Sequence, residues 1–135
     1  MKNLFFTLLI ITFLSCNDTT DNNPFLPNVN VNFTVDLNLP QNNNLIIGGY
    51  VIYPDVGVRG VVVNFNGLTY SAVDLACPHL ELQNCSVMTV EGSFVVCPCD
   101  DERFQIFDGA SVNNIGSSAR TYQVVKNGNL LRITN

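Results

Sequence analysis

The sequence predicts an all-β domain of short antiparallel strands, and three observations support this fold class. Apolar residues alternate with mostly polar ones from Val29 to Leu39, the period-two pattern of a strand with one buried face. Asn-Gly pairs at 66–67 and 127–128 each separate two apolar runs, and this pair is a strong signature of a tight hairpin. No stretch shows a sustained 3.6-residue periodicity. Short strands with turns about every ten residues indicate an antiparallel sandwich or barrel.

The remaining elements follow from apolar runs bounded by turn residues. We expect a strand over 45–53, with a bend or bulge at Gly48-Gly49, because glycine inside a strand weakens its pairing. Glu91-Gly92 is expected to close a further hairpin, and four aromatic side chains are expected in the core: Phe94, Phe104, Phe107 and Tyr122. The other expected strands cover 60–65, 68–75, 87–90, 93–96, 103–107, 122–125 and 130–133.

Composition limits the chain to one globular domain and argues against nucleic acid as a partner. The chain has 135 residues, of which 47% are hydrophobic, so it can bury a real core. Its formal net charge is −5, and no basic stripe is present that could neutralise phosphates.

The N-terminus predicts export. Lys2 precedes an apolar run from Leu4 to Leu14, which as a helix would rise only about 16 Å and is too short to span a bilayer. The run ends at Ser15-Cys16, which resembles the bacterial lipoprotein box, in which the chain is cut before a cysteine that then carries lipid. The alternative is an ordinary secretory peptide with an incidental cysteine. The signal has no twin arginine, so we expect export as an unfolded chain.

These features divide the chain into three parts. Residues 1–15 are expected to be a lipoprotein signal peptide, and residues 16–28 a flexible tether rich in Asn, Asp, Thr and Pro. Residues 29–135 are expected to form the β-domain. Lipid on Cys16 would anchor the protein to a bacterial membrane, on its periplasmic or cell-surface side.

The remaining cysteines gather in two clusters around the only histidine of the chain. The first cluster is Cys77-Pro78-His79, and the second is Cys97-Pro98-Cys99-Asp100. Each lies where an expected strand ends, so each is expected in a loop at a strand tip. Two such loops can face each other and form one site.

The spacing of these clusters resembles that of the Rieske iron–sulfur family. Cys-x-His, a gap of 17 residues, Cys-Pro-Cys-x-x-x-Arg-Phe and then Phe-Asp-Gly follow the family pattern, and the resemblance covers roughly residues 45–135. It implies a Rieske-like β-domain with two metal-site loops at one end. In that family, two cysteines bind one iron of a [2Fe–2S] cluster and two histidines bind the other. By position, Cys77, Cys97 and His79 would be three of these ligands.

The chain departs from the family pattern at the fourth ligand and around it. The position of the second histidine is occupied by Asp100, the glycine that usually follows by Asp101, and the usual serine by Glu102. With Glu81, these residues would crowd the site with negative charge. The proline-rich loop that covers the cluster in the family has no counterpart, because residues 117–121 contain no proline.

The resemblance also implies a disulfide. Many Rieske domains join their two loops through the second cysteine of Cys-Pro-Cys, which corresponds to Cys99. Its partner would be Cys85, three residues later than the usual position. Four cysteines allow three pairings, and an oxidising compartment favours their formation.

Three interpretations of the site follow. The one we favour is a cluster-free, disulfide-stapled binding or structural domain in which Cys77 and Cys97 are also oxidised. The second is a [2Fe–2S] electron-transfer protein with Cys77, Cys97, His79 and Asp100 as ligands, although export as an unfolded chain argues against a cluster assembled in the cytoplasm. The third is a mononuclear zinc site formed by the same four residues.

Enzymatic activity beyond electron transfer is not indicated. The sequence contains no recognisable nucleophile–base pair, phosphate-binding loop or paired general acid and base. The acidic run Asp100-Asp101-Glu102 does not have the spacing of a calcium loop, so we interpret it as a solvated turn.

Overall fold

A computed structural model describes residues 23–135. The expected signal peptide, Cys16 and the first part of the expected tether lie outside the described residues. Within them, no helix is long and apolar enough to cross a membrane.

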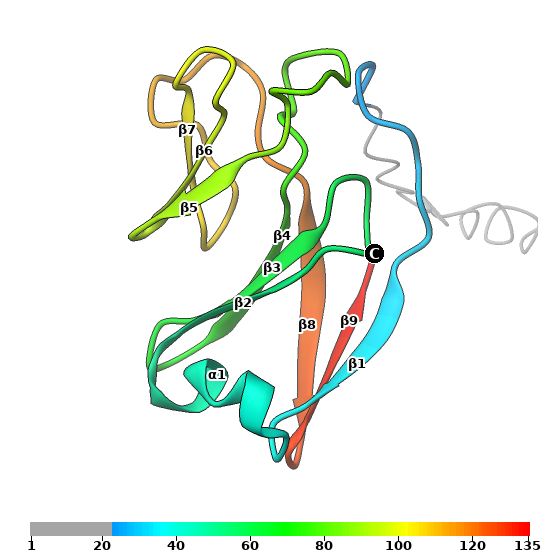
Figure 1. The fold of residues 1–135 in the computed structure, drawn as a ribbon, viewed down its shortest axis with the longest axis vertical. Helices are drawn as coiled ribbons and strands as arrows, with labels where there is room; N and C mark the ends of the chain where they lie inside the picture. The colour runs from blue at the N-terminus through cyan, green and yellow to red at the C-terminus, as the bar shows by residue number, and fades with distance from the viewer. Residues whose placement is uncertain (1–22) are drawn as a thin grey trace, which may run out of the picture.

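Apart from one 3-10 turn and one turn of α-helix, the regular secondary structure of the described residues is antiparallel β-strand, so the expected all-β fold class is confirmed (Figure 1). Six strands form one curled sheet in the order β1-β9-β8-β4-β3-β2, and three form a small sheet in the order β5-β6-β7. The strands are β1 (Asn32–Asp36), β2 (Gly49–Tyr53), β3 (Val61–Phe65), β4 (Tyr70–Asp74), β5 (Thr89–Glu91), β6 (Phe94–Val96), β7 (Arg103–Gln105), β8 (Thr121–Asn127) and β9 (Leu130–Thr134).

The three expected hairpins form with the expected turns. β3 pairs with β4 around Asn66-Gly67, β5 with β6 around Glu91-Gly92, and β8 with β9 around Asn127-Gly128. All three turn glycines have positive φ, the conformation that residues with a Cβ adopt reluctantly. The turn chemistry in the sequence therefore determined the local pairing correctly.

The strand expected over 45–53 is partly wrong. Asn44–Ile47 form one turn of helix, α1, which follows a 3-10 turn at Pro40–Asn42, and the strand β2 begins only at Gly49. Leu45 is fully buried whereas Ile46 and Ile47 are exposed, so burial does not alternate here. Gly48 has φ of 97° and connects the helical turn to the strand. The apolar run was too short for its periodicity to distinguish helix from strand.

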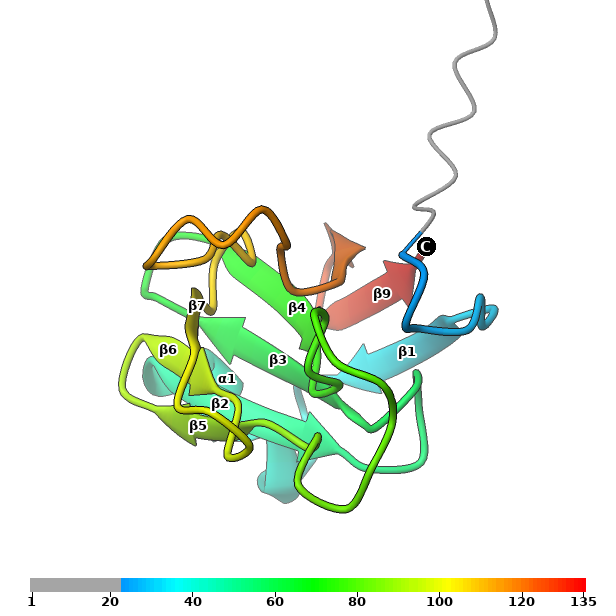
Figure 2. The same ribbon diagram turned by 90° about the horizontal axis from the view of Figure 1, so that it is seen from above.

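The described residues have two separate clusters of buried hydrophobic side chains. One fills the curled sheet and includes Val35, Leu45, Val63, Leu131 and Ile133. The other lies between the end of that sheet and the small sheet, and contains Cys77, Cys97 and Phe104. In Figure 1, the small sheet and the loops beside it occupy one end of the molecule, and α1 lies at the other. Figure 2 looks down on the end with the small sheet, and α1 lies farther from the viewer. Phe104 and Tyr122 are buried as expected, whereas Phe94 is half-buried and Phe107 is 42% exposed, which contradicts the expected core position of Phe107.

The described part of the expected tether lies against the domain. Leu26 is buried, and the side chain of Asn23 donates a hydrogen bond to the carbonyl oxygen of Pro78 at 2.8 Å. Arg120 donates to the carbonyl oxygens of Pro27 at 2.7 Å and Leu26 at 3.4 Å. Asn23, Leu26 and Pro27 therefore contact the domain, and the expected boundary at residue 29 stays a prediction. Of the two large apolar side chains in this segment, Phe25 and Leu26, only Leu26 is buried.

Candidate functional site

The two cysteine-bearing loops meet at one end of the molecule. The first runs from β4 to β5 and the second from β6 to β7. The first loop is held by an antiparallel bridge between Ala76 and Val87 and by a hydrogen bond from the Cys77 N–H to the Ser86 carbonyl oxygen at 3.0 Å. In the second loop, the Cys97 carbonyl oxygen accepts a hydrogen bond from the Asp101 N–H at 2.8 Å. Both loops are thus fixed by their backbones.

Two disulfides connect these loops. Cys77 is bonded to Cys97, with their Cα atoms 5.6 Å apart, and Cys85 is bonded to Cys99, with their Cα atoms 5.1 Å apart. The first disulfide is fully buried, whereas both cysteines of the second are partly exposed. By the chain-entropy model, closing loops of 20 and 14 residues stabilises the fold by about 3 kcal/mol each.

His79 and Asp100 face each other across the loops. The His79 Nε2 lies 2.6 Å from the Asp100 Oδ2. Burial raises the pKa of Asp100, but hydrogen bonds from His79 and from the Glu102 N–H outweigh it and hold that pKa below its usual range. Because an ionised carboxylate only accepts hydrogen bonds, Nε2 carries the hydrogen of this contact.

The other ring nitrogen of His79 lacks a hydrogen-bond partner. Its Nδ1 is buried and has no partner among the described residues. The ring lies against Phe104, with centroids 5.7 Å apart. A buried nitrogen without a partner is uncommon, and binding a metal ion is one way to satisfy it. Potential ligand atoms of His79, Cys97 and Asp100 lie within 4.8 Å of one another, so these residues form a possible metal-binding group.

The acidic residues expected to crowd the site separate into different environments. Glu102 is buried at 8% exposure, where it accepts hydrogen bonds from Ser111 Oγ at 2.7 Å and Asn113 Nδ2 at 2.9 Å. The hydrogen bonds from Asn113 and Ser111 lower the pKa of Glu102 below its usual value despite burial. Glu81 and Asp101 are exposed. The acidic run is therefore only in part the solvated turn that we expected.

Asp101 adopts a backbone conformation that suits glycine. Its φ is 61°, in the left-handed region that residues with a Cβ avoid at a cost of about 1 kcal/mol. The turn between Cys97 and Glu102 requires this conformation, because the Asp101 N–H must reach back to the Cys97 carbonyl oxygen. Glycine would meet the requirement without strain.

A buried carboxylate fixes the entry to the first loop. Asp74, at the end of β4, is fully buried and accepts hydrogen bonds from the Ala76 N–H at 2.9 Å and the Val58 N–H at 2.7 Å. The Tyr122 hydroxyl donates to it at 2.7 Å, and the Arg59 N–H at 3.2 Å. Burial, and then the nearby Asp74, raise the pKa of Tyr122 well above its usual range. Asp74 thus ties the start of the Cys77 loop to β8 and to the 57–60 turn.

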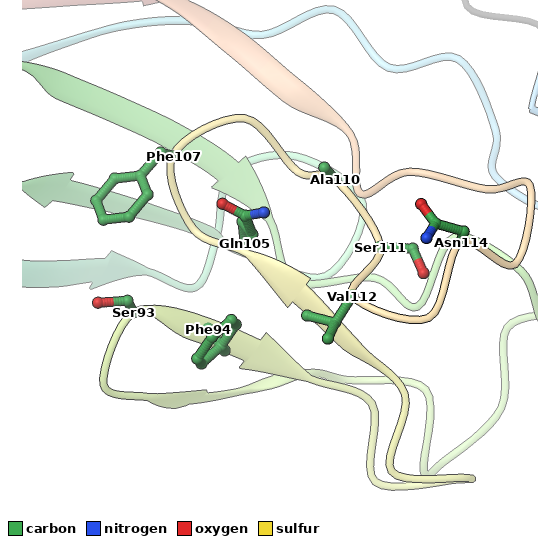
Figure 3. A pocket seen from close by; sticks show the side chains of 8 residues that line it. All are labelled: Ser93, Phe94, Gln105, Phe107, Ala110, Ser111, Val112 and Asn114. Carbon is green, nitrogen blue, oxygen red and sulfur yellow. The ribbon is translucent and has the colours of Figure 1, made fainter.

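A shallow hollow lies on the outer side of the small sheet and the loop that follows β7. It encloses about 550 Å³ and is lined by the eight residues labelled in Figure 3. Phe94, Phe107 and Val112 supply its apolar lining, and the rest is hydroxyl, amide and methyl groups. No lining residue titrates near neutral pH, so the hollow offers no acid–base chemistry.

The residues present do not fit a [2Fe–2S] cluster in this state. The sulfurs of Cys77 and Cys97 are bonded to each other, so neither is the thiolate that iron requires. The chain supplies one imidazole, and Asp100 at the other histidine position is engaged with it. In the segment before β8, Ala119 and Arg120 are buried, and Arg120 donates a hydrogen bond to the carbonyl oxygen of Pro27.

The described residues form an all-β domain with a Rieske-like fold. A solved ferredoxin in complex with the reduced oxygenase of carbazole 1,9a-dioxygenase has a TM-score of 0.53 to this chain at 16% identity, covering 77% of this chain and 93% of that one. The ferredoxin of carbazole 1,9a-dioxygenase from Nocardioides aromaticivorans IC177 has 25% identity and a TM-score of 0.48, covering 78% and 94%. The E. coli protein NirD has 15% identity and a TM-score of 0.42, covering 79% and 94%.

No protein-family model and no curated protein sequence matches the chain. The expected Rieske-like fold is supported by the structural similarity to the ferredoxin. Because the sequence identity is only 16%, this similarity is evidence for the fold and not for a function.

Sequence reasoning found the centre of the site but missed its supports. The structure brings Cys77, His79, Cys97 and Asp100 together, with Cys85 and Cys99 beside them. The roles of Asn23, Ser111 and Asn113 had no sequence signal, because isolated polar residues in loops are common. Asp74 did carry a signal, since it is the one acidic residue within the apolar run 68–75.

Proposed function

We propose that this chain is an exported, lipid-anchored domain of Rieske-like fold that works without an iron–sulfur cluster, as a disulfide-stapled binding or structural module. The observation that carries this proposal is the buried disulfide between Cys77 and Cys97, the two positions that the family uses as thiolate ligands. The loss of the second histidine at Asp100 and of the proline-rich cover supports it independently.

The anchored end of the chain supports a particular orientation of this module. Cys16 lies seven residues before Asn23, a stretch that spans at most about 25 Å. The Asn23 side chain donates a hydrogen bond to the carbonyl oxygen of Pro78, the residue between Cys77 and His79. If Cys16 carries lipid, the extended chain between Cys16 and Asn23 can therefore separate the disulfide end of the domain from the bilayer surface by at most about 25 Å.

The test uses the full-length chain, produced with its own leader in a bacterium that attaches lipid to lipoproteins. We expect incorporation of labelled fatty acid that is abolished in Cys16→Ser, no free thiols under denaturing conditions, and no iron or acid-labile sulfide. Iron and sulfide in stoichiometric amounts would show an electron-transfer protein and overturn the cluster-free assignment. A lack of fatty acid with a normal disulfide count would overturn the anchor alone.

A second candidate function is metal binding by the reduced domain. It is favoured by the unpartnered Nδ1 of His79 and by the proximity of His79, Cys97 and Asp100. Reduction would add Cys77 and give two sulfurs, one nitrogen and one oxygen, a tetrahedral set suited to zinc. Sulfur ligands of one zinc ion lie about 3.8 Å apart, so the two sulfurs must separate once their bond is broken.

This second function is tested by titrating the phosphine-reduced chain with Co²⁺ and recording its absorption. Thiolate-to-cobalt charge-transfer bands at one equivalent, lost in Cys77→Ser and weakened in His79→Ala, are expected if the site binds metal. The Glu81→Gln variant, which changes an exposed carboxylate nearby, is the matched control and should leave the bands unchanged. Absence of the bands in the reduced wild-type chain would eliminate this candidate.

A further inference from the structure

The two disulfides lie side by side. The sulfurs of Cys77, Cys97 and Cys99 are all within 4.8 Å of one another, so a sulfur of the partly exposed disulfide nearly contacts both sulfurs of the buried one. Cys85 is outside this group of three. We propose that Cys99 is the internal nucleophile of a thiol–disulfide relay, which lets an external dithiol open the buried Cys77–Cys97 disulfide. The proposal rests on the disulfide-stapled state proposed above.

Burial determines the order of events. Cys77 and Cys97 are fully buried, so an external thiol cannot approach their sulfurs. Cys85 and Cys99 are partly exposed. Because exchange requires direct attack of a thiolate on sulfur, a dithiol reductant meets the Cys85–Cys99 bond first. The expected substrate is therefore a dithiol, either a protein with paired cysteines or a small molecule.

The chemistry balances in two steps. The dithiol gives two electrons to the Cys85–Cys99 bond and becomes a disulfide, leaving Cys85 and Cys99 as thiols. The Cys99 thiolate then attacks Cys77 or Cys97, which forms one new sulfur–sulfur bond, breaks the Cys77–Cys97 bond and releases the other cysteine as a thiolate. The second step consumes no further reductant, because one disulfide is exchanged for another.

Geometry makes the second step feasible. Reacting atoms need to approach to about 3.5 Å, and the three sulfurs already lie within 4.8 Å of one another. Once its bond to Cys85 is broken, the Cys99 side chain is free to rotate. The released thiolate lies in the loop region of His79, so the relay would couple an external thiol to the set of potential metal ligands.

A pair of matched variants tests the role of Cys99. Cys85→Ser and Cys99→Ser remove the same disulfide, but only Cys85→Ser leaves the proposed nucleophile. With a fixed dithiol such as dithiothreitol, we expect the Cys77–Cys97 bond of the full chain to open at least about tenfold faster in Cys85→Ser than in Cys99→Ser. Equal rates in the two variants would refute the relay.

A second measurement uses the wild-type chain and does not depend on how the variants fold. One equivalent of dithiothreitol is added, free thiols are trapped by alkylation, and the peptides are mapped after cleavage following Glu81 and Glu91, which separates Cys77 and Cys85 from each other and from the Cys97–Cys99 segment. The relay predicts trapped Cys85 together with Cys77 or Cys97. Trapping of Cys85 and Cys99 alone would overturn it.

The two proposals fail in distinguishable ways. A free thiol at Cys77, Cys85, Cys97 or Cys99, or bound iron, in the untreated wild-type chain would contradict the disulfide-stapled function before any reductant is added. Two intact disulfides together with equal rates in the matched variants would leave that function standing and remove only the relay.

Discussion

The hydroxyl of Tyr122 offers a direct test of how the first loop is held. It donates a 2.7 Å hydrogen bond to Asp74, which is fully buried and also accepts from three backbone N–H groups. Replacing Tyr122 with Phe keeps the ring and its packing while removing one of these four donors. The perturbation is therefore confined to a single hydrogen bond to a buried acidic side chain.

The expected cost of Tyr122→Phe follows from that environment. Hydrogen bonds to charged groups contribute about 1.5–3 kcal/mol, and no water reaches the buried Asp74 to replace the lost donor. We expect the free energy of unfolding to fall by about 2 kcal/mol. At about 4 °C per kcal/mol for a domain of this size, the midpoint of thermal unfolding should fall by about 8 °C.

The assay is urea and thermal unfolding of the full chain with its disulfides intact, followed by circular dichroism. Tyr50→Phe is the matched control, because Tyr50 is 40% exposed and its hydroxyl makes no hydrogen bond within residues 23–135. It should unfold like the wild type. A loss of less than about 0.5 kcal/mol in Tyr122→Phe would refute the view that this donor is needed by a buried acidic side chain.

Three further perturbations have expected outcomes of their own. Asp101→Gly should raise the free energy of unfolding by about 1 kcal/mol in urea titrations, because glycine accepts the φ of 61° without strain, and a destabilised variant would contradict this. Gly109→Ala should lower the free energy of unfolding by about 3 kcal/mol, because the new Cβ would overlap the Ala119 carbonyl oxygen and the residue has a φ of 73°. Gly116→Ala is the control: nothing lies within 4 Å of the new Cβ, so this variant measures the cost of the positive φ alone. Glu102→Gln concerns pH: the pKa of Glu102 is lowered in the fold, so its stabilisation is complete above its ordinary value of 4.5 and is lost as pH falls through the lower folded value. Between pH 6 and about pH 3, the free energy of unfolding should therefore fall less in Glu102→Gln than in the wild type. Parallel curves for the two proteins would contradict this role of Glu102.

Much of the fold could be predicted because its information is local. Asn66-Gly67 and Asn127-Gly128 determine their hairpins through backbone geometry that few other residue pairs accept. The expected strand over 45–53 was partly wrong because the helical turn around Leu45 depends on tertiary packing, and four residues carry no measurable period.

The site was predictable only where spacing carries chemistry. The positions of Cys77, His79 and Cys97 identified two loops that must converge. The contact between His79 and Asp100 joins side chains 21 positions apart. Of the neighbouring apolar residues Phe25 and Leu26, only Leu26 is buried against the domain. Such long-range contacts depend on the assembled fold and leave no periodic pattern in the sequence.

The order of the cysteines along the chain has a consequence for biosynthesis. The bonds 77–97 and 85–99 interleave, so each closes over one end of the other. If the chain is oxidised while it emerges with its N-terminus first, Cys77 and Cys85 become available before Cys97 and Cys99. An early bond between Cys77 and Cys85 matches neither native pair. Maturation would then require a disulfide isomerase or slow spontaneous reshuffling, over seconds to hours. Production in a host without isomerase should consequently yield more mispaired species at early times than production with it.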